Sequence, residues 1–176
     1  IGPEQPGLPF VTSRIKAGET VRVFAMSPYD QAIAAAFKAV VPDATIDVST
    51  WETEGKTLAQ LEGDAKTVRN ANPPYDFVLI GVPLAITPNA ENPTEEEIRS
   101  YLWTLNWSLS FGIQQWDFAA ATPAILMPLT VDDEGRNRFA RQLIHAQHVN
   151  LIDRPTDDQT SAEEILTGWL KAQLKE

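Results

Sequence analysis

The hydrophobic and polar positions of the chain follow two periods in turn, and together they predict strands that alternate with helices. Short apolar runs bounded by proline, glycine or asparagine predict strands at residues 20–26, 44–50, 75–82, 116–127 and 148–152. Apolar positions three and four residues apart predict helices at residues 28–41, 57–70, 94–112, 136–146 and 161–174. The run YDFVLIGV at residues 75–82 is almost unbroken, which is typical of a central parallel strand covered on both faces.

This alternation predicts a single α/β domain. Each helix is long enough to serve as a right-handed crossover between parallel strands, so the helices should cover both faces of the sheet. We expect a three-layer α/β/α sandwich of flavodoxin-like topology, with five parallel strands in the order 2-1-3-4-5. Residues 1–19 are expected to form an irregular lead-in rich in proline and glycine, and residues 20–176 the domain. In such sheets the ligand crevice lies at the carboxyl ends of the strands, near the switch point between the first and third.

Composition and charge narrow the classes of function. The chain has 24 acidic and 14 basic residues and a net charge of -10, which argues against nucleic acid or an anionic membrane as a partner. The longest apolar run, FAAATPAILMPL, is far shorter than the roughly 18 residues of a membrane span. We therefore expect a soluble domain, and we interpret the start at Ile1 as a cut from a longer chain or a processed form, without a predicted location.

The residue types also limit the chemistry. There is no cysteine, which excludes disulfides and thiolate sites. The first turn, AMSPYDQ, has neither the glycine pattern nor the lysine of a phosphate-binding loop, so no nucleotide, flavin or other cofactor is expected.

Three segments carry a resemblance to a known family. VFAMS closes the first strand, STWETEGKTLAQL follows the second strand, and YDFVLIGVP forms the third. In this order they resemble the SGNH (GDSL-like) hydrolases, a three-layer superfamily of esterases, lipases and carbohydrate deacetylases. The resemblance implies Ser27 as the catalytic nucleophile and Gly55 as an oxyanion-hole residue. It also implies Asp157, which begins the nearest match to the family's Asp-x-x-His, as a second catalytic residue, and a carbohydrate or an acyl ester as the ligand.

The chain departs from this family at the positions that the family uses for catalysis. Val82-Pro83-Leu84-Ala85 stands where the family has Gly-x-Asn-Asp, so the oxyanion-hole asparagine is missing. Thr160 stands where the catalytic histidine should be, and the other close match, Asp153 to Thr156, also ends in a threonine. A serine without a base is a weak nucleophile. His145 ends the fourth helix and His148 opens the fifth strand, which places both near the amino edge of the sheet, far from Ser27. The departures predict a site that has lost catalysis.

Ser27 and the tryptophans each allow a second interpretation. Ser27 followed by Pro28 and Asp30 fits the start of a helix, and we favour a helix cap over a nucleophile. Trp51 is expected on the loop after the second strand, inside the crevice, where it could bind a sugar ring by stacking. Trp103 and Trp107 are four residues apart on one helix, and we expect them to pack in the core.

Three functional hypotheses follow from these patterns. The first is a catalytically degenerate SGNH-like domain that acts as a ligand-binding or structural module of a larger protein. The second is an active serine esterase or carbohydrate deacetylase with a non-standard site that uses Ser27. The third is an interaction domain or a metal-dependent domain. Five aspartates are expected in loops at the carboxyl edge of the sheet, where they could bind a divalent cation, but we favour solvated turn residues over a metal site: Asp132, Asp133, Asp153, Asp157 and Asp158.

Overall fold

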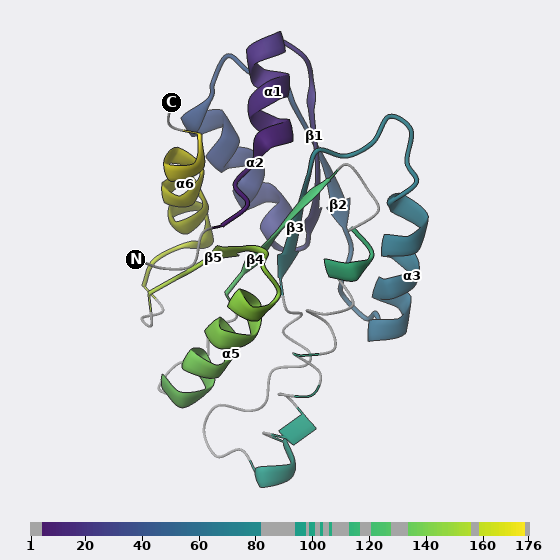
Figure 1. Ribbon diagram of the computed structural model, residues 1–176, viewed down its shortest axis with the longest axis vertical. Coiled ribbons are helices and arrows are strands. Elements are labelled where there is room, and N and C mark those ends of the chain that lie inside the picture. Colours follow the sequence, from purple (N-terminus) through teal and green to yellow (C-terminus); the bar gives the residue numbers. More distant parts are fainter. Residues whose placement is uncertain are drawn as a thin grey trace.

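The computed structural model has the predicted parallel sheet between two layers of helices (Figure 1). It describes residues 5–81, 94–97, 99–100, 103, 106, 113–116, 121–127, 134–155 and 159–174. The strands are β1 (Val21–Met26), β2 (Ile46–Trp51), β3 (Phe77–Gly81), β4 (Thr122–Leu126) and β5 (Asn150–Ile152). The helices are α1 (Pro9–Ala17), α2 (Tyr29–Val40), α3 (Leu58–Val68), α5 (Glu134–Ala146) and α6 (Ala162–Gln173).

The strand order confirms the flavodoxin-like topology. The sheet runs β2-β1-β3-β4-β5, and every neighbouring pair is parallel. All five residues of β3 are buried, as expected of a central strand that helices cover on both faces. Because the strands are parallel, the segments that follow β1, β2 and β3 all emerge at the same edge of the sheet. This edge is where the candidate site has to be sought.

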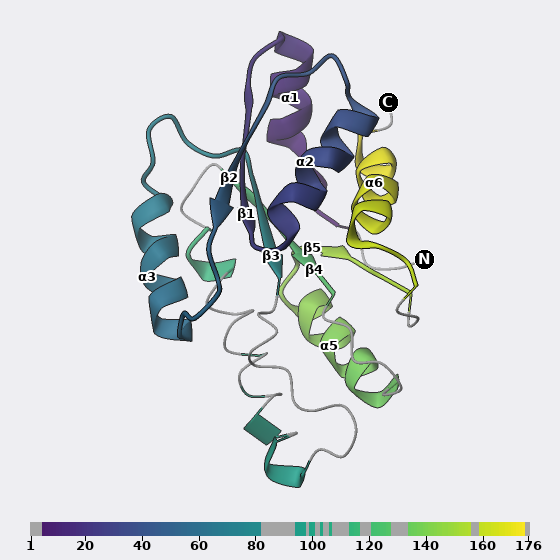
Figure 2. The ribbon, with the colours of Figure 1, turned by 180° about the vertical axis from the view of Figure 1, so that it is seen from behind.

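The core is divided by the sheet into two clusters. On one face α1, α2 and α6 pack against the strands, with Phe37 and Leu166 fully buried. On the other face α3 and α5 pack together with residues 113–116, around Trp51 and Trp116. Figures 1 and 2 show the two helix layers from opposite sides. Within the part of the chain described here, no helix combines the length and apolarity needed to cross a membrane.

Three helix starts follow the capping chemistry that their sequences indicate. At the start of α3, the Thr57 hydroxyl accepts a bond from the Gln60 amide while the Gln60 side chain accepts from the Thr57 amide. Ser161 and Glu164 form the same reciprocal pair at the start of α6. Thr94 and Glu97 form it before the helical residues 95–97.

The segment before β1 differs from the expectation of an irregular lead-in. Residues 9–17 form α1, in which Val11 is fully buried against the sheet. Residues 5–8, here called the N-terminal strap, lie along β5. The carboxamide of Asn150, fully buried, accepts a bond from the Gly7 amide (2.9 Å) and donates one to the Gly7 carbonyl (2.8 Å). The division into a lead-in and one domain stays a prediction.

Candidate functional site

The candidate site begins where β1 ends. β1 pairs with both β2 and β3, so the residue that follows it lies beside the ends of its two neighbours. Met26 is in register with Trp51, and this pairing places Ser27 opposite the segment that leaves β2. Ser27 is therefore at the switch point of the sheet, as the sequence predicted.

Ser27 is bonded to the loop that follows β2 through both its side chain and its backbone. Its Oγ accepts a hydrogen bond from the Thr53 amide (3.1 Å) and lies 3.2 Å from the Thr53 hydroxyl oxygen. The Thr53 hydroxyl donates to the Ser27 carbonyl (3.0 Å), and the Ser27 amide donates to the Trp51 carbonyl (2.9 Å). We call this set of contacts the Ser27–Thr53 bridge. It ties the ends of two neighbouring strands together.

The bridge replaces the helix cap that the sequence predicted. Helix α2 begins at Tyr29, and its N-cap residue is Pro28, which makes no side-chain cap. The cap prediction for Ser27 was wrong because the helix starts at Tyr29, one residue later than predicted, and the Ser27 hydroxyl bonds to Thr53 instead. Asp30 lies in the first turn of α2 as predicted, and its carboxylate accepts a bond from the Thr50 hydroxyl (2.7 Å).

Gly55, the predicted oxyanion-hole residue, lies at the turn of the loop between β2 and α3. Its φ of 70° is in the left-handed region that favours glycine, and a Cβ built there would meet no atom within 4 Å. The amide that meets Ser27 Oγ is that of Thr53, two residues earlier. Sequence reasoning missed Thr53, because the register of β1 against β2 that brings it to Ser27 is not evident from the pattern of residues.

Trp51 lies in the core, and its predicted place on a crevice loop was wrong. It is the last residue of β2 and is 2% exposed. One face of its ring stacks on Phe24 at a centroid distance of 5.0 Å, and Trp116 packs edge-on at 6.1 Å. The indole Nε1–H donates to Asp64 (3.3 Å). Stacking on a sugar needs an exposed ring face, which the buried ring of Trp51 does not offer.

Tyr29 fills space on the β3 side of the switch point. A Cβ built on Gly81, the last residue of β3, would lie 2.8 Å from Cε2 of the Tyr29 ring. Only glycine fits at that position with the ring in place. The Gly81 amide donates to the Met26 sulfur (3.3 Å), which holds the ends of β1 and β3 together.

The titratable groups that the sequence proposed do not gather at Ser27 within the described residues. His145 is in the last turn of α5, and His148 precedes β5, so both lie toward the amino edge as expected. Asp153, just after β5, is bonded to Arg141 (3.0 Å). Asp132, Asp133, Asp157 and Asp158 lie outside the described residues. No group of three or more histidine or carboxylate side chains in the described part could hold a metal ion.

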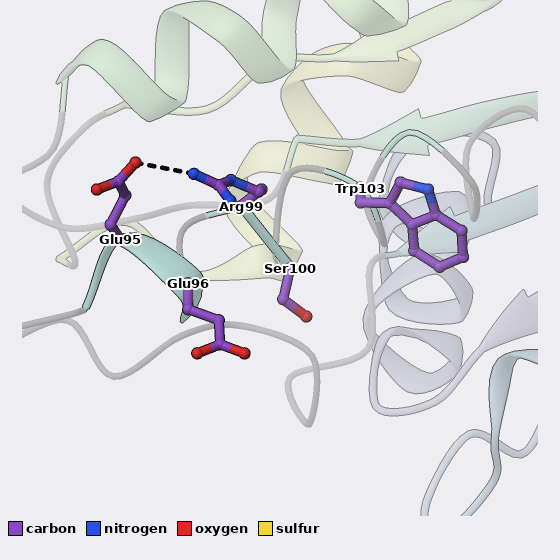
Figure 3. A pocket seen from close by; sticks show the side chains of 5 residues that line it. All are labelled: Glu95, Glu96, Arg99, Ser100 and Trp103. Carbon is purple, nitrogen blue, oxygen red and sulfur yellow. Dashed lines mark hydrogen bonds and ion pairs between the residues drawn. The ribbon is translucent and has the colours of Figure 1, made fainter.

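The structure corrects the prediction made for Trp103. Trp103 is 65% exposed, so the expectation that it packs in the core was wrong. Trp107 lies outside the described residues. Trp103 borders an open pocket with Glu95, Glu96, Arg99 and Ser100 (Figure 3).

Comparison with known proteins identifies the fold. No family model and no curated protein sequence matches the chain. Among solved structures, two catalytic mutants of Axe2, an acetylxylan esterase from Geobacillus stearothermophilus, match with TM-scores of 0.51 and 0.50. Their sequences are 15% and 16% identical to this chain, and each match covers 77% of this chain and 76% of the esterase. A further mutant of Axe2, described as an acetyl-xylooligosaccharide esterase, matches with a TM-score of 0.51 and 16% identity. The chain therefore shares the α/β fold of this acetylxylan esterase.

Proposed function

We propose that this chain is an SGNH-hydrolase-like domain without hydrolase activity, which acts as a ligand-binding module with a carbohydrate as its ligand. The observation that carries the loss of activity is the Ser27–Thr53 bridge. A serine nucleophile needs a base beside its hydroxyl, and the hydroxyl of Ser27 instead contacts the amide and hydroxyl of Thr53. The carbohydrate is supported by the fold shared with esterases of acetylated xylan.

The backbone of Ser27 supports the same proposal. In serine hydrolases the oxyanion of the intermediate is held by backbone amides that point at its position. The Ser27 amide is bonded to the Trp51 carbonyl at 2.9 Å, and the Thr53 amide points at the Ser27 hydroxyl oxygen itself. Two amides near the serine are therefore engaged in holding the strand ends together.

A second candidate function is an active serine esterase or carbohydrate deacetylase. Ser27 follows β1 at the switch point, in the position where the resembling family has its nucleophile, and this placement favours the alternative. Ser27 would attack the ester carbonyl and lose its proton to Asp157 or another base, Gly55 would help to hold the oxyanion, and the alcohol would leave. Water would then hydrolyse the acyl-enzyme and release the acid.

Labelling with a fluorophosphonate distinguishes the two functions. We expect no adduct on the purified protein by intact mass, and no hydrolysis of acetylated xylooligosaccharides above the rate of the Ser27→Ala variant. An activated serine reacts covalently with the reagent, whereas a hydroxyl without a base does not. An adduct that peptide mapping assigns to Ser27, and that Ser27→Ala abolishes, would establish the esterase instead.

Removal of the Ser27 hydroxyl should also destabilise the domain. In Ser27→Ala the Thr53 amide loses its acceptor, and we expect the free energy of unfolding to fall by about 1 kcal/mol in urea denaturation. Replacement of a catalytic residue commonly raises the free energy of unfolding, because active sites are optimised for activity at the expense of stability. Higher stability of Ser27→Ala would contradict the structural role.

A double-mutant cycle tests whether this loss of stability comes from the contacts of the Ser27–Thr53 bridge. Thr53→Val removes the hydroxyl that bonds to the Ser27 carbonyl and keeps the side-chain shape. If the two side chains act together, the losses of the single variants should not add in the double variant. Additive losses would show that Ser27 and Thr53 stabilise the domain independently.

A further inference from the structure

The pocket beside Trp103 is a surface feature separate from the switch point. It has a volume of about 620 Å³, within the range of about 300–1,000 Å³ common for ligand sites. The helical residues 95–97, 99 and 100, which form part of its surroundings, lie at the end of the molecule opposite α1 in both views (Figures 1 and 2). The following five residues line it: Glu95, Glu96, Arg99, Ser100 and Trp103.

The sequence spacing of these residues is that of neighbours on one face of a helix. Glu95, Arg99 and Trp103 follow one another at intervals of four, and Glu96 and Ser100 are also four apart. Figure 3 shows the Glu95–Arg99 pair at one end of the row, Ser100 in the middle and Trp103 at the other end.

Trp103 is an unusual residue to leave in contact with water. Its exposed fraction is 65%, compared with 46% for Phe10 and 38% for Phe139, the other large hydrophobic side chains that are exposed among the described residues. A flat indole presents an apolar face and an N–H donor together, and such rings are common where one side of a ligand is apolar and the other polar. A pyranose ring has this character, because C–H groups cover its faces and hydroxyls its rim.

The polar residues of the pocket match the rim of a sugar. The Arg99 guanidinium donates to Glu95 (2.8 Å), so a donor group and an acceptor group lie side by side at the pocket. Carboxylates accept hydrogen bonds, the guanidinium donates them, and the Ser100 hydroxyl does both, so sugar hydroxyls find partners of each kind. Two carboxylates against one guanidinium also give the lining a negative balance, which disfavours phosphate and acidic saccharides.

From this arrangement we infer that the Trp103 pocket binds a neutral oligosaccharide, with a sugar ring stacked on the indole and hydroxyls bonded to Arg99 and Glu95. The inference rests on the proposed carbohydrate ligand and names the surface that holds it. It does not depend on whether Ser27 is reactive.

Titration with acetylated and with deacetylated xylooligosaccharides tests the inference. We expect Trp103→Ala to weaken binding by about tenfold or more in calorimetry, and Trp103→Phe, which keeps a ring, to weaken it much less. Phe10→Ala removes an exposed aromatic side chain from α1, at the opposite end of the molecule, and should bind as the unchanged protein does. The oligosaccharide should also protect tryptophan fluorescence from acrylamide, except in Trp103→Ala.

The outcomes separate this inference from the proposed function. Equal binding by the unchanged protein and Trp103→Ala, with unchanged melting temperatures, would overturn the Trp103 pocket and keep the carbohydrate ligand. No binding to the unchanged protein would overturn both, while the fluorophosphonate result on Ser27 would stand by itself. Binding of oligolysine instead, lost in Trp103→Ala and in high salt, would overturn the saccharide and assign the pocket to a cationic protein segment.

Discussion

Replacement of Trp51 by alanine is expected to lower the free energy of unfolding by about 4 kcal/mol, the cost typical of removing a buried tryptophan. The ring is 2% exposed and lies between Phe24 and Trp116, so its removal leaves a cavity in the core beneath α3 and α5. Urea denaturation, monitored by circular dichroism, measures the loss.

Trp51→Phe is the matched control for this prediction. A phenyl ring can keep the stacking on Phe24 but not the hydrogen bond to Asp64, and we expect a loss of about 1–2 kcal/mol. The two variants also decide between a structural and a ligand-binding Trp51. If Trp51→Ala kept nearly the free energy of unfolding of the unchanged protein but lost oligosaccharide binding, Trp51 would be a ligand-binding residue and not a core residue.

Replacement of Asp76 by alanine is expected to cost about 3 kcal/mol in unfolding free energy. Asp76 is 3% exposed, just before β3, and its carboxylate accepts bonds from the Arg22 amide (3.0 Å) and from Arg14 Nε (3.2 Å). Hydrogen bonds to Glu19 and to Asp76 raise the pKa of Arg14 above its ordinary value. The variant leaves a partly buried backbone donor without a partner, and this desolvated group accounts for most of the cost.

Asp76→Asn distinguishes the contribution of the Arg22 bond from that of the Arg14 ion pair. The amide oxygen can still accept from the Arg22 amide, while the ion pair with Arg14 is lost, so we expect a loss of about 1 kcal/mol in the same denaturation assay. Equal losses for Asp76→Asn and Asp76→Ala would contradict this prediction, because they would attribute the whole loss of stability to the ion pair with Arg14 and none to the bond from the Arg22 amide.

The sheet could be predicted from the sequence because its signals are local and strong. The apolar run of β3 and the capping pairs at Thr57 and Ser161 each specify their own segment. Helix α1 was missed because its sequence follows a run of proline and glycine and buries little. Within it only Val11 is buried, so no apolar stripe indicates a helix.

The candidate site could be located from the sequence, but its contacts could not. The end of β1 at Ser27 follows from the pattern, whereas its bonds to Thr53 depend on the register between β1 and β2. The two tryptophan assignments failed for a similar reason. Whether Trp51 or Trp103 meets water depends on which elements pack over it, and that is decided by residues far away in the chain.

The N-terminal strap has a consequence for how the chain folds. Gly7 and Asn150 are 143 residues apart, and Gln5 and Leu151 are 146 residues apart, yet both pairs are hydrogen-bonded. During synthesis the strap leaves the ribosome more than 140 residues before its partner strand. Contacts of such long sequence separation slow folding, since closing the loop costs entropy before any bond forms. We therefore expect the strap to dock last, and the edge of β5 to stay uncovered in the nascent domain until then.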